Sequence, residues 1–304
     1  MNQQFLTELK AVTAENRIFT DEPMKKHTTF RVGGPADILV QPKGTELAAV
    51  IRLCRKYDVP YQVIGNGSNL LVGDRGIRGL VIEMLSKEDE ICVEDDCITV
   101  GAGMLLSKTA NRAAEHGLTG MEFAAGIPGS IGGAVVMNAG AYGGEMKDIL
   151  TAVTVLDQEG NEKIFSAEEL ELGYRTSCIL KKGYIVMGAK IKLKHGEETA
   201  IRARMEELKK QRVEKQPLEY PSAGSTFKRP EGYFAGKLIQ DAGLKGYRVG
   251  GAMVSEKHSG FVINYDNATA TDIINLMKDV RKKVYEEFQV TLEPEVKILP
   301  AVKW

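Results

Sequence analysis

The chain has 304 residues, and its 40 basic and 41 acidic side chains give a formal net charge of −1. This balance excludes the strongly basic surface that binding to nucleic acid or to an acidic membrane requires. The length predicts two or three domains, and 43% hydrophobic with 27% charged residues is ordinary for a globular protein.

Cysteine and histidine are both scattered along the sequence. The four cysteines form no CxxC pair, and the four histidines show no metal-ligand spacing. The N-terminal residues carry no basic segment followed by an apolar core, so they do not resemble a secretory signal. The sequence therefore predicts no metal site, reduced thiols, a cytoplasmic location and no obligate protein partner.

The first third of the chain predicts helices and strands in alternation. Phe5, Leu6, Leu9 and Val12 share one face of an amphipathic N-terminal helix. Further on, apolar spacing and turn residues predict two short strands over residues 27–42 joined through Gly33, Gly34 and Pro35, a helix over 45–58 and a strand over 59–64.

A glycine-rich turn, Gly65-Asn66-Gly67-Ser68-Asn69, follows that strand. It fails the dinucleotide-binding fingerprint, because Leu70 replaces the third glycine and the following residues read as strands. It also fails the P-loop pattern, since no Lys-Ser/Thr pair follows. The turn is either a nest of backbone donors for a pyrophosphate or a plain hairpin turn, and the local pattern leaves both open.

A second short glycine motif, Gly101-Ala102-Gly103, joins a strand over residues 98–100 to a helix over 105–116. The third glycine is again missing, with Leu106 in its place, and no acidic residue stands in the ribose-binding position. We interpret this motif as the start of a helix.

Residues 117–147, hereafter the glycine-rich stretch, dominate the sequence. Between Glu122 and Glu145 there are no charged side chains, and seven of the 22 residues are glycine. Pro128 and the glycine clusters interrupt any membrane-spanning helix. Tight turns packed in a core are an alternative. The pattern favours a buried loop–helix–loop whose backbone N–H groups approach a large, partly anionic ligand.

The second half predicts mixed helices and strands. Arg212 and Lys215 lie near the end of a strongly basic helix. They either belong to a solvated face or hold a substrate phosphate. The predicted elements are a hairpin of strands 152–156 and 163–165, a strand 184–193, a helix 200–215, a turn entering a strand at 221–227, a helix from 237 capped by Gly243, a strand 261–264, a helix 271–288 and a strand 292–299.

Seven segments in this order together resemble the UDP-N-acetylenolpyruvoylglucosamine reductase (MurB) family over essentially the whole chain. They are TTFRVGGPAD, IGNGSNLLV, EFAAGIPGSIGGAVVMNAGAYG, GYRTS, SAGSTFKRP, KLIQDAGLKGYRVGGA and EPEV. GYRTS passes directly into a strand, so the chain is similar to the shorter type II members, which lack the inserted tyrosine lid. The family usually has Asn where this chain has Gly260.

The resemblance implies an α+β fold with a two-part FAD-binding module of the PCMH (vanillyl-alcohol-oxidase-like) type and a C-terminal α/β substrate-binding domain. The implied division is residues 1–86 and 87–198 for the two flavin subdomains and 199–296 for the substrate domain. Residues 297–304 are expected to pack back on the first subdomain.

The resemblance also implies a reaction. The family reduces UDP-N-acetyl-3-O-enolpyruvylglucosamine to UDP-N-acetylmuramate for peptidoglycan synthesis, with non-covalent FAD and with NADPH as co-substrate. The implied cofactor-binding residues are Gly65, Asn66, Gly67, Ser68, Asn69, Gly126, Ile127, Pro128, Gly129, Ser130, Gly132, Gly133, Asn138, Ala139 and Gly140.

Three residues carry the implied catalysis. Arg175 would stabilise negative charge on the enolpyruvyl carboxylate, and Ser225, which lacks the GxSxG context of a hydrolase nucleophile, would donate a proton. Glu295 would orient Arg175 or, if protonated, polarise that carboxylate. The implied substrate-binding residues are Tyr142, Arg212, Lys215 and Arg229.

Two other interpretations compete. Another flavin oxidoreductase of the same fold, such as an alcohol oxidase, commonly attaches its flavin through histidine, and the glycine-rich stretch between Glu122 and Glu145 has none. A non-catalytic nucleotide-binding protein would explain the glycine-rich turns and the basic helix. It gives no reason for Arg175, Ser225 and Glu295 to occur together in these sequence contexts.

Overall fold

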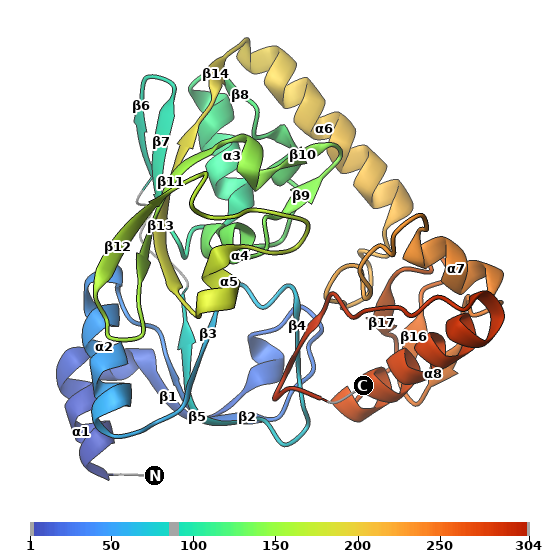
Figure 1. Cartoon of the computed structure of the whole chain (residues 1–304), viewed down its shortest axis with the longest axis horizontal. Coiled ribbons are helices and arrows are strands. Elements are labelled where there is room, and N and C mark those ends of the chain that lie inside the picture. Colours follow the sequence, from blue (N-terminus) through green and yellow to red (C-terminus); the bar gives the residue numbers. More distant parts are fainter. Residues whose placement is uncertain (1–2, 85–90, 303–304) are drawn as a thin grey trace. The chain divides into compact units, whose positions relative to one another are not determined.

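A computed structural model describes residues 3–84 and 91–302. The chain divides into two compact units (Figure 1). Unit 1 comprises Met1–Thr20, Ile38–Asn66 and Gly79–Arg212, and unit 2 comprises Asp21–Asp37, Gly67–Arg78 and Val213–Trp304. Each unit is therefore built from segments that are distant in sequence. The division into residues 1–86, 87–198 and 199–296 remains a prediction.

Unit 1 holds most of the regular structure. Its helices are α1 (Gln3–Val12), α2 (Gly44–Lys56), α3 (Leu106–Glu115), α4 (Ile131–Val136), α5 (Cys178–Lys182) and most of α6 (Glu198–Lys215). Its strands are β3 (Tyr61–Ile64), β6 (Ile91–Glu94), β7 (Cys97–Gly101), β8 (Leu118–Thr119), β9 (Gly140–Ala141), β10 (Gly144–Glu145), β11 (Leu150–Leu156), β12 (Glu162–Ser166), β13 (Ile185–Lys192) and β14 (Lys194–His195).

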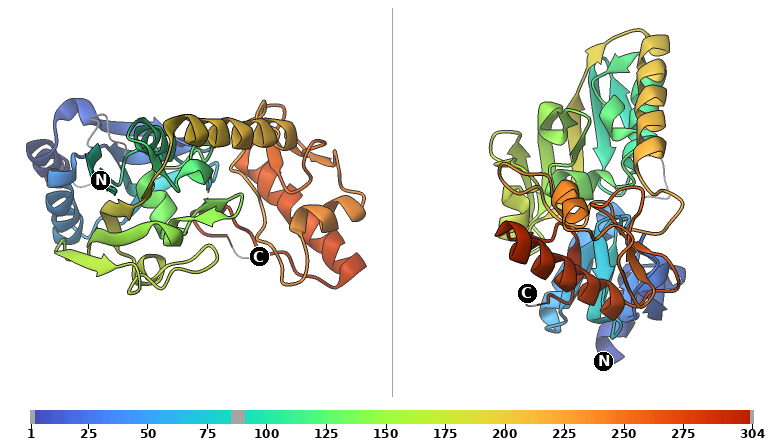
Figure 2. Two further views of the ribbon diagram at one scale, coloured as in Figure 1. Left: turned by 90° about the horizontal axis from the view of Figure 1, so that it is seen from above. Right: turned by 90° about the vertical axis from the view of Figure 1, so that its right-hand side faces the viewer.

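A five-stranded antiparallel sheet with the order β12-β11-β13-β7-β6 is the centre of unit 1. Alternating residues such as Val153 and Val155 are buried, as expected for a sheet with one covered face. Helices α3 and α4 contribute apolar side chains, including Ala110 and Ile131, to the same core. Figure 2 shows α6 in this unit as a long helix without interruption.

A second core of unit 1 lies around α1 and α2. Phe5 and Leu9 of α1 and Leu47 and Ile51 of α2 are fully buried, in agreement with the predicted amphipathic faces. Strands β3 and β5 (Ile77–Glu83) pair in parallel beneath them. They belong to a four-stranded sheet, β1-β2-β5-β3, completed by β1 (Ile18–Pro23) and β2 (Pro35–Val40).

Unit 2 has its own core around the longest helix, α8 (Ala270–Phe288). Thr269 and Asp272 form a capping box that fixes where α8 begins. The remaining elements of unit 2 are α7 (Ala235–Asp241), β4 (Leu70–Val72), β15 (Arg248–Val249), β16 (Ala252–Val254), β17 (Val262–Asn264) and β18 (Lys297–Leu299). Strand β18 pairs in parallel with β4. Short 3-10 helices elsewhere in the chain are η1 (Glu15–Arg17), η2 (Met24–Lys26), η3 (Glu122–Ala124) and η4 (Met146–Asp148).

Three predicted strands differ from the structure. The segment before Gly33 forms no strand, because Arg31 has φ 55° and its N–H closes a turn onto Thr28. Residues 221–227 form only isolated bridges. The last predicted strand is limited to β18. In each case buried apolar residues in irregular chain produced a pattern that resembles a strand.

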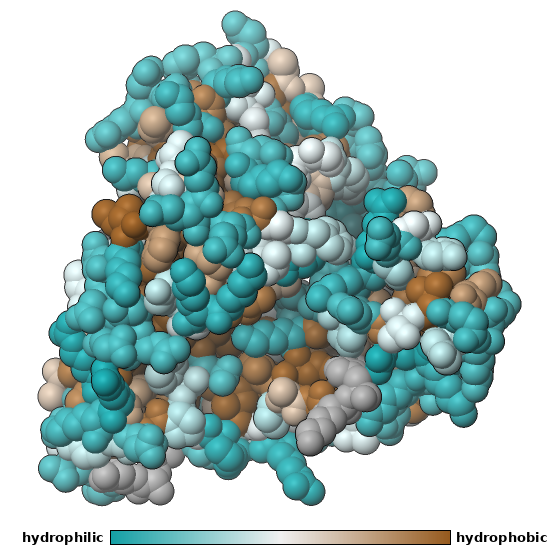
Figure 3. All heavy atoms as spheres, viewed as in Figure 1, coloured by the Kyte–Doolittle hydropathy of each residue, from teal (hydrophilic) through white to brown (hydrophobic). Residues whose placement is uncertain are grey.

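Hydrophilic residues predominate on the face shown in Figure 3. Over residues 3–84 and 91–302, no helix has both the length and the apolar character needed to cross a membrane.

The β11–β12 turn depends on one carboxylate. Asp157 accepts hydrogen bonds from the backbone N–H groups of Glu159 and Asn161 and pairs with Lys163. The backbone hydrogen bond from Asn161 is the largest cause of a pKa lowered from the ordinary 3.8 to about 2. The carboxylate therefore stabilises the fold above pH 3.8, and this stabilisation is lost as the pH falls through about 2.

We expect Asp157→Asn to lower the melting temperature at neutral pH, because the charge that holds the turn is removed. The difference from the parent chain should close between about pH 4 and pH 2, where Asp157 itself becomes protonated. Thermal unfolding of both chains across this range tests it, with Glu162→Gln on β12 as a charge-removal control. A difference that does not change with pH would contradict the assignment.

Candidate active site

The glycine-rich stretch is a loop–helix–loop, as predicted. It runs from η3 through the short helix α4 to a hairpin of β9 and β10. Ser130 caps α4 by accepting a hydrogen bond from the N–H of Gly133. Tyr142 and Gly143, with φ of 53° and 88°, form the two-residue turn of the hairpin.

The turn at residues 65–66 lies directly against this stretch. A Cβ atom on Gly65 would stand 2.2 Å from Ser130 Oγ, so only glycine fits there. Asn66 donates its side-chain N–H to the carbonyl of Pro128 over 2.7 Å. Gly65 and Asn66 are therefore part of one surface with the glycine-rich stretch in unit 1.

This surface fits a large, partly anionic cofactor. Within the described residues, the backbone N–H groups of Gly126 and Gly129 donate to no protein acceptor. Gly126 is exposed and Gly129 half-buried, so a ligand can reach both donors. Neutral residues around them leave the donors uncompensated by acidic groups. Such donors suit the pyrophosphate and the polar ring edge of FAD, so the residues present are compatible with that group.

Two predicted substrate-binding residues lie at one end of this surface. The guanidinium of Arg212 donates to the carbonyl of Gly126. Burial lowers the pKa of Arg212, while the nearby Tyr142 acts in the opposite direction. The structure therefore brings Arg212 to the glycine-rich stretch, which itself contains Tyr142. Their contact with a substrate phosphate remains a prediction.

Arg175 lies in a strained two-residue turn. Gly173 and Thr176 exchange backbone hydrogen bonds, and Arg175 between them has φ 54°, a conformation that favours glycine. Its guanidinium donates to the carbonyl of Gly140 over 3.5 Å. Glycine would be less strained at this position, so the substitution Arg175→Gly can separate the role of the side chain from that of the backbone.

In unit 2, Ser225 and Glu295 lie on paired segments. The N–H of Glu295 donates to the carbonyl of Thr226 over 2.9 Å, and Lys228 pairs in the same way with Glu293. The side chain of Asn69 donates to the carbonyl of Glu295 over 3.1 Å. Two predicted catalytic residues and one predicted cofactor-binding residue are thus held together.

The other predicted residues are distributed as follows. Lys215 is exposed at the end of α6. Arg229 is exposed, with its guanidinium 4.0 Å from the centre of the Phe234 ring. Gly65, Asn66, Gly126, Ile127, Pro128, Gly129, Ser130, Gly132, Gly133, Asn138, Ala139, Gly140, Tyr142, Arg175 and Arg212 belong to unit 1, and Gly67, Ser68, Asn69, Lys215, Ser225, Arg229 and Glu295 to unit 2.

Two supporting residues were not predicted. Ser177 donates its hydroxyl to the carbonyl of Val136 and caps α5. Glu145 accepts a hydrogen bond from Asn138. An isolated asparagine in a long uncharged run was the only sequence signal for this arrangement, because a buried amide needs polar partners.

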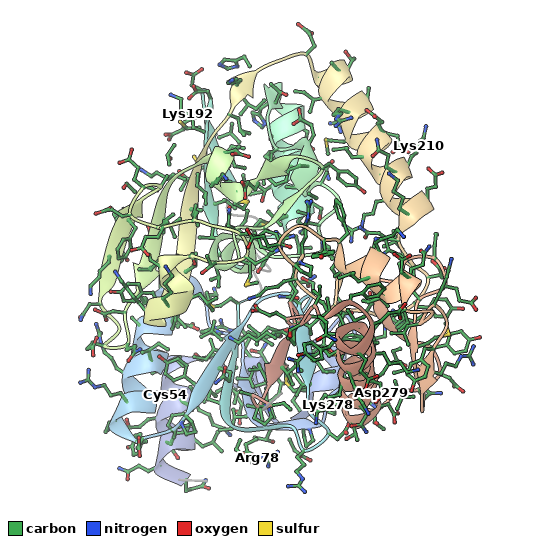
Figure 4. The ribbon with its side chains drawn as sticks, turned by 45° about the vertical axis from the view of Figure 1, so that its right-hand side comes forward. Cys54, Arg78, Lys192, Lys210, Lys278 and Asp279 are labelled. Carbon is green, nitrogen blue, oxygen red and sulfur yellow. The ribbon has the colours of Figure 1, made fainter. Side chains whose placement is uncertain are left out.

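Cys54 on α2, labelled in Figure 4, is a buried thiol. It is 1% exposed, and burial raises its pKa to about 12, which disfavours the thiolate form that acts as a nucleophile. Over residues 3–84 and 91–302, no three His, Cys, Asp or Glu side chains are grouped to hold a metal ion.

Two family models match parts of this chain. Residues 36–166 match the FAD binding domain model, and residues 216–299 match the model of the UDP-N-acetylenolpyruvoylglucosamine reductase C-terminal domain. A UDP-N-acetylenolpyruvoylglucosamine reductase of Agathobacter rectalis is 54% identical, with 98% of this chain and 99% of the relative covered. A relative of the same name from Lachnoclostridium phytofermentans is 55% identical, with 98% of each chain covered.

Solved structures give the same result. The crystal structure of UDP-N-acetylenolpyruvylglucosamine reductase from Thermus caldophilus superposes with a TM-score of 0.79 at 41% identity, covering 91% of this chain and 97% of that one. An alkyldihydroxyacetonephosphate synthase shares the fold alone, with a TM-score of 0.51 at 16% identity over 64% of this chain and 41% of that one.

The match to the FAD binding domain and the named relatives define an FAD-dependent oxidoreductase with a PCMH-like flavin module. With more than half of its residues identical to curated relatives over nearly its full length, the chain belongs to the UDP-N-acetylenolpyruvoylglucosamine reductase family. The comparisons favour this family over the two competing interpretations, the alcohol oxidase and the non-catalytic nucleotide-binding protein.

We expect Gly65→Ala to weaken FAD binding by about 10-fold or more, because relief of a 2.2 Å clash must move Ser130 Oγ out of its cap on α4 or separate the two segments. Flavin fluorescence titration measures the dissociation constant. The matched control is Gly44→Ala, where the new methyl group meets only Met187 at 4.0 Å.

Removal of the Ser130 hydroxyl should relieve the same clash. Because the close atom is Ser130 Oγ, the double variant Gly65→Ala/Ser130→Ala should recover part of the lost affinity. If Gly65→Ala binds FAD as tightly as the parent chain, the proposed contact surface is wrong.

Proposed function

We propose that this chain catalyses the NADPH-dependent reduction of UDP-N-acetyl-3-O-enolpyruvylglucosamine to UDP-N-acetylmuramate, a step in peptidoglycan precursor synthesis. The observation that carries the proposal is that the backbone of Glu295 is bonded in unit 2 both to Asn69 and to Thr226, the residue directly after Ser225. A protein that only bound a nucleotide would have no need to hold a proton donor and a carboxyl group beside a cofactor-binding residue.

FAD, when bound, supplies hydride transfer from NADPH to the terminal carbon of the enolpyruvyl group. Gly65, Gly126 and Gly129 provide the close backbone approach and the N–H donors that hold it without a covalent bond. NADPH and the nucleotide substrate would use the same pocket in turn, so the reaction would be of the ping-pong type.

Arg175 stabilises the negative charge that develops on the substrate during the reduction. As the terminal carbon accepts a hydride, negative charge spreads from the neighbouring carbon into the substrate carboxylate. A guanidinium remains protonated throughout and can donate two parallel hydrogen bonds to a carboxylate. Its fixed position in the 173–176 turn means that little reorganisation is needed when the charge develops.

Ser225 completes the reduction by donating a proton to the carbon that carries the charge. A hydroxyl is a weak acid, so it must act at short range on a strongly basic centre. Its neighbour Thr226 is 1% exposed and bonded on both sides, to Val262 through its hydroxyl and to Glu295 through its carbonyl. Glu295, on the adjoining segment, acts on the same substrate carboxylate.

Tyr142, Arg212, Lys215 and Arg229 are proposed to bind the nucleotide diphosphate. Their types suit this task, since guanidinium and ammonium groups are the usual partners of phosphate oxygens. The proposed partner is a small-molecule nucleotide sugar. We place the reaction in the cytoplasm, which supplies NADPH and keeps thiols such as the free Cys92 and Cys97 reduced.

An anaerobic spectrum of the holoprotein tests the assignment. Flavin absorbance should disappear on addition of NADPH and return only when the enolpyruvyl nucleotide is added. If the absorbance disappears but does not return, the substrate assignment fails while the flavin assignment stands. A chain that cannot take up FAD would refute both.

We expect Ser225→Ala to slow reoxidation by the enolpyruvyl nucleotide by about 10²–10⁴-fold, the usual contribution of a positioned proton donor. Reduction by NADPH should be unchanged, because it needs no proton from Ser225. Stopped-flow absorbance resolves the two half-reactions, and Ser225→Cys, which keeps a proton at this position, should retain more activity. Equal loss in both half-reactions would contradict the role.

Arg175→Gly should separate stability from activity. Glycine relieves the φ of 54°, worth about 1 kcal/mol, so the melting temperature should not fall. Reoxidation by the nucleotide should still slow by orders of magnitude, since the guanidinium is lost. A variant that is destabilised but fully active would show that Arg175 has a structural role instead.

A further inference from the structure

The side chain of Asn138 is fully hydrogen-bonded close to the turn that carries Arg175. The residue is 0% exposed and has φ 42°, a conformation that Asn and Asp tolerate better than most residues. Its side-chain N–H groups donate to Glu145 Oε2 over 2.7 Å and to the carbonyl of Gly173 over 3.2 Å. Its side-chain oxygen accepts from the N–H of Lys147 over 2.9 Å.

These bonds join two segments that are not adjacent in sequence. Glu145 and Lys147 lie at the base of the β9–β10 hairpin, and Gly173 opens the turn that contains Arg175. That turn is strained at Arg175, so it needs an external support to persist. The guanidinium in turn reaches the carbonyl of Gly140 in β9. Asn138 therefore fixes both the turn and the hairpin that Arg175 contacts.

We propose that Asn138 is a positioning residue for the reaction, whose buried amide holds the turn at Gly173 against the β9–β10 hairpin and so aims the Arg175 guanidinium. The proposal rests on the function proposed above for Arg175. The proposal also limits how Asn138 could contact FAD. Because the side-chain amide is hydrogen-bonded to protein groups, any contact with the cofactor would be made by the backbone of this residue.

Ser177 supports the same arrangement from the other side of the turn. Its hydroxyl donates to the carbonyl of Val136, at the end of α4, over 2.7 Å. The turn is thus tied to the glycine-rich stretch at both of its ends, by Asn138 before Arg175 and by Ser177 after it. The amide of Asn138 bonds directly to Gly173, which is part of the turn.

Asn138→Asp is the isosteric test, because it removes both donated hydrogen bonds and keeps the volume. It also places a second carboxylate beside Glu145, which can destabilise the fold by itself. The double variant Asn138→Asp/Glu145→Gln removes this complication. The amide introduced at position 145 can donate to the carboxylate introduced at position 138, so the hairpin base is restored while the carbonyl of Gly173 stays without its donor.

The deciding measurement is the rate of single-turnover reoxidation of the NADPH-reduced holoprotein by the enolpyruvyl nucleotide. Three further quantities are measured with it: the rate of reduction by NADPH, the FAD affinity and the melting temperature. The double variant should keep the last three near the values of the parent chain. Reoxidation should slow on the order of 100-fold, the usual result of a displaced catalytic group. Normal reoxidation in the double variant would overturn the proposal.

A second comparison separates positioning from general destabilisation. If Asn138 acts through Arg175, Asn138→Asp/Glu145→Gln should cost nothing further in an Arg175→Ala background. A full additional loss there would overturn the proposal. The matched control is Asn161→Asp, which likewise sets a new carboxylate against an existing one, Asp157, at the β11–β12 turn. It should leave reoxidation unchanged.

The same experiments distinguish the two proposals. If Arg175→Ala alone reoxidises at the rate of the parent chain, the function proposed for Arg175 fails. If Arg175→Ala is slow and the Asn138 double variant is fast, the role of Asn138 alone is refuted.

Discussion

Close approach between Gly65 and Ser130 is the constraint on which the rest of the site depends. Two chain segments distant in sequence meet where a single methyl group would prevent contact, and the bond from Asn66 to Pro128 locks them together. Backbone donors can then face one ligand from a rigid base. Further hydrogen bonds extend this base. Ser130 caps α4, Asn138 just after α4 bonds Glu145 in β10, and Ser177 directly after the 173–176 turn bonds Val136 in α4.

The absence of charged side chains between Glu122 and Glu145 gives the few charged groups nearby more influence. A guanidinium among neutral residues is weakly screened, so it acts strongly on a developing negative charge. Burial lowers the pKa of Arg212, which shows that these surroundings are costly for a cation. The carbonyl groups of Gly126 and Gly140, which accept from Arg212 and Arg175, offset part of that cost without neutralising the positive charge.

The sequence predicted those parts of the fold in which local pattern and tertiary burial agree. Helix α8 begins one residue from its predicted start, because Thr269 caps it and Ile273, Leu276 and Val280 repeat on its buried face. The segment around Phe30 was wrongly predicted as a strand. Its alternation comes from burial of Phe30 and Val32, whereas the backbone is bent by the left-handed Arg31.

For the site, too, some features could be predicted from the sequence and others could not. Recognition of the motifs was enough to predict the family and the FAD-binding fold, and both are confirmed. The partners of Asn138 could not be predicted, since Gly173 is 35 residues away and nothing local marks it as an acceptor. The roles of Arg175, Ser225 and Glu295 remain predictions, because they depend on chemistry that sequence comparison and a fold do not measure.

The path of the chain through unit 2 has a consequence for how the protein is made. Phe30, Val32 and Leu71 are buried in one core with Leu276, Val284 and Ile298, which are translated about two hundred residues later or more. During synthesis these early side chains cannot be buried in the core until the ribosome has translated nearly the whole chain. The slowest part of maturation should therefore be the closure of this core, and early exposed apolar segments are the natural point at which a chaperone would act.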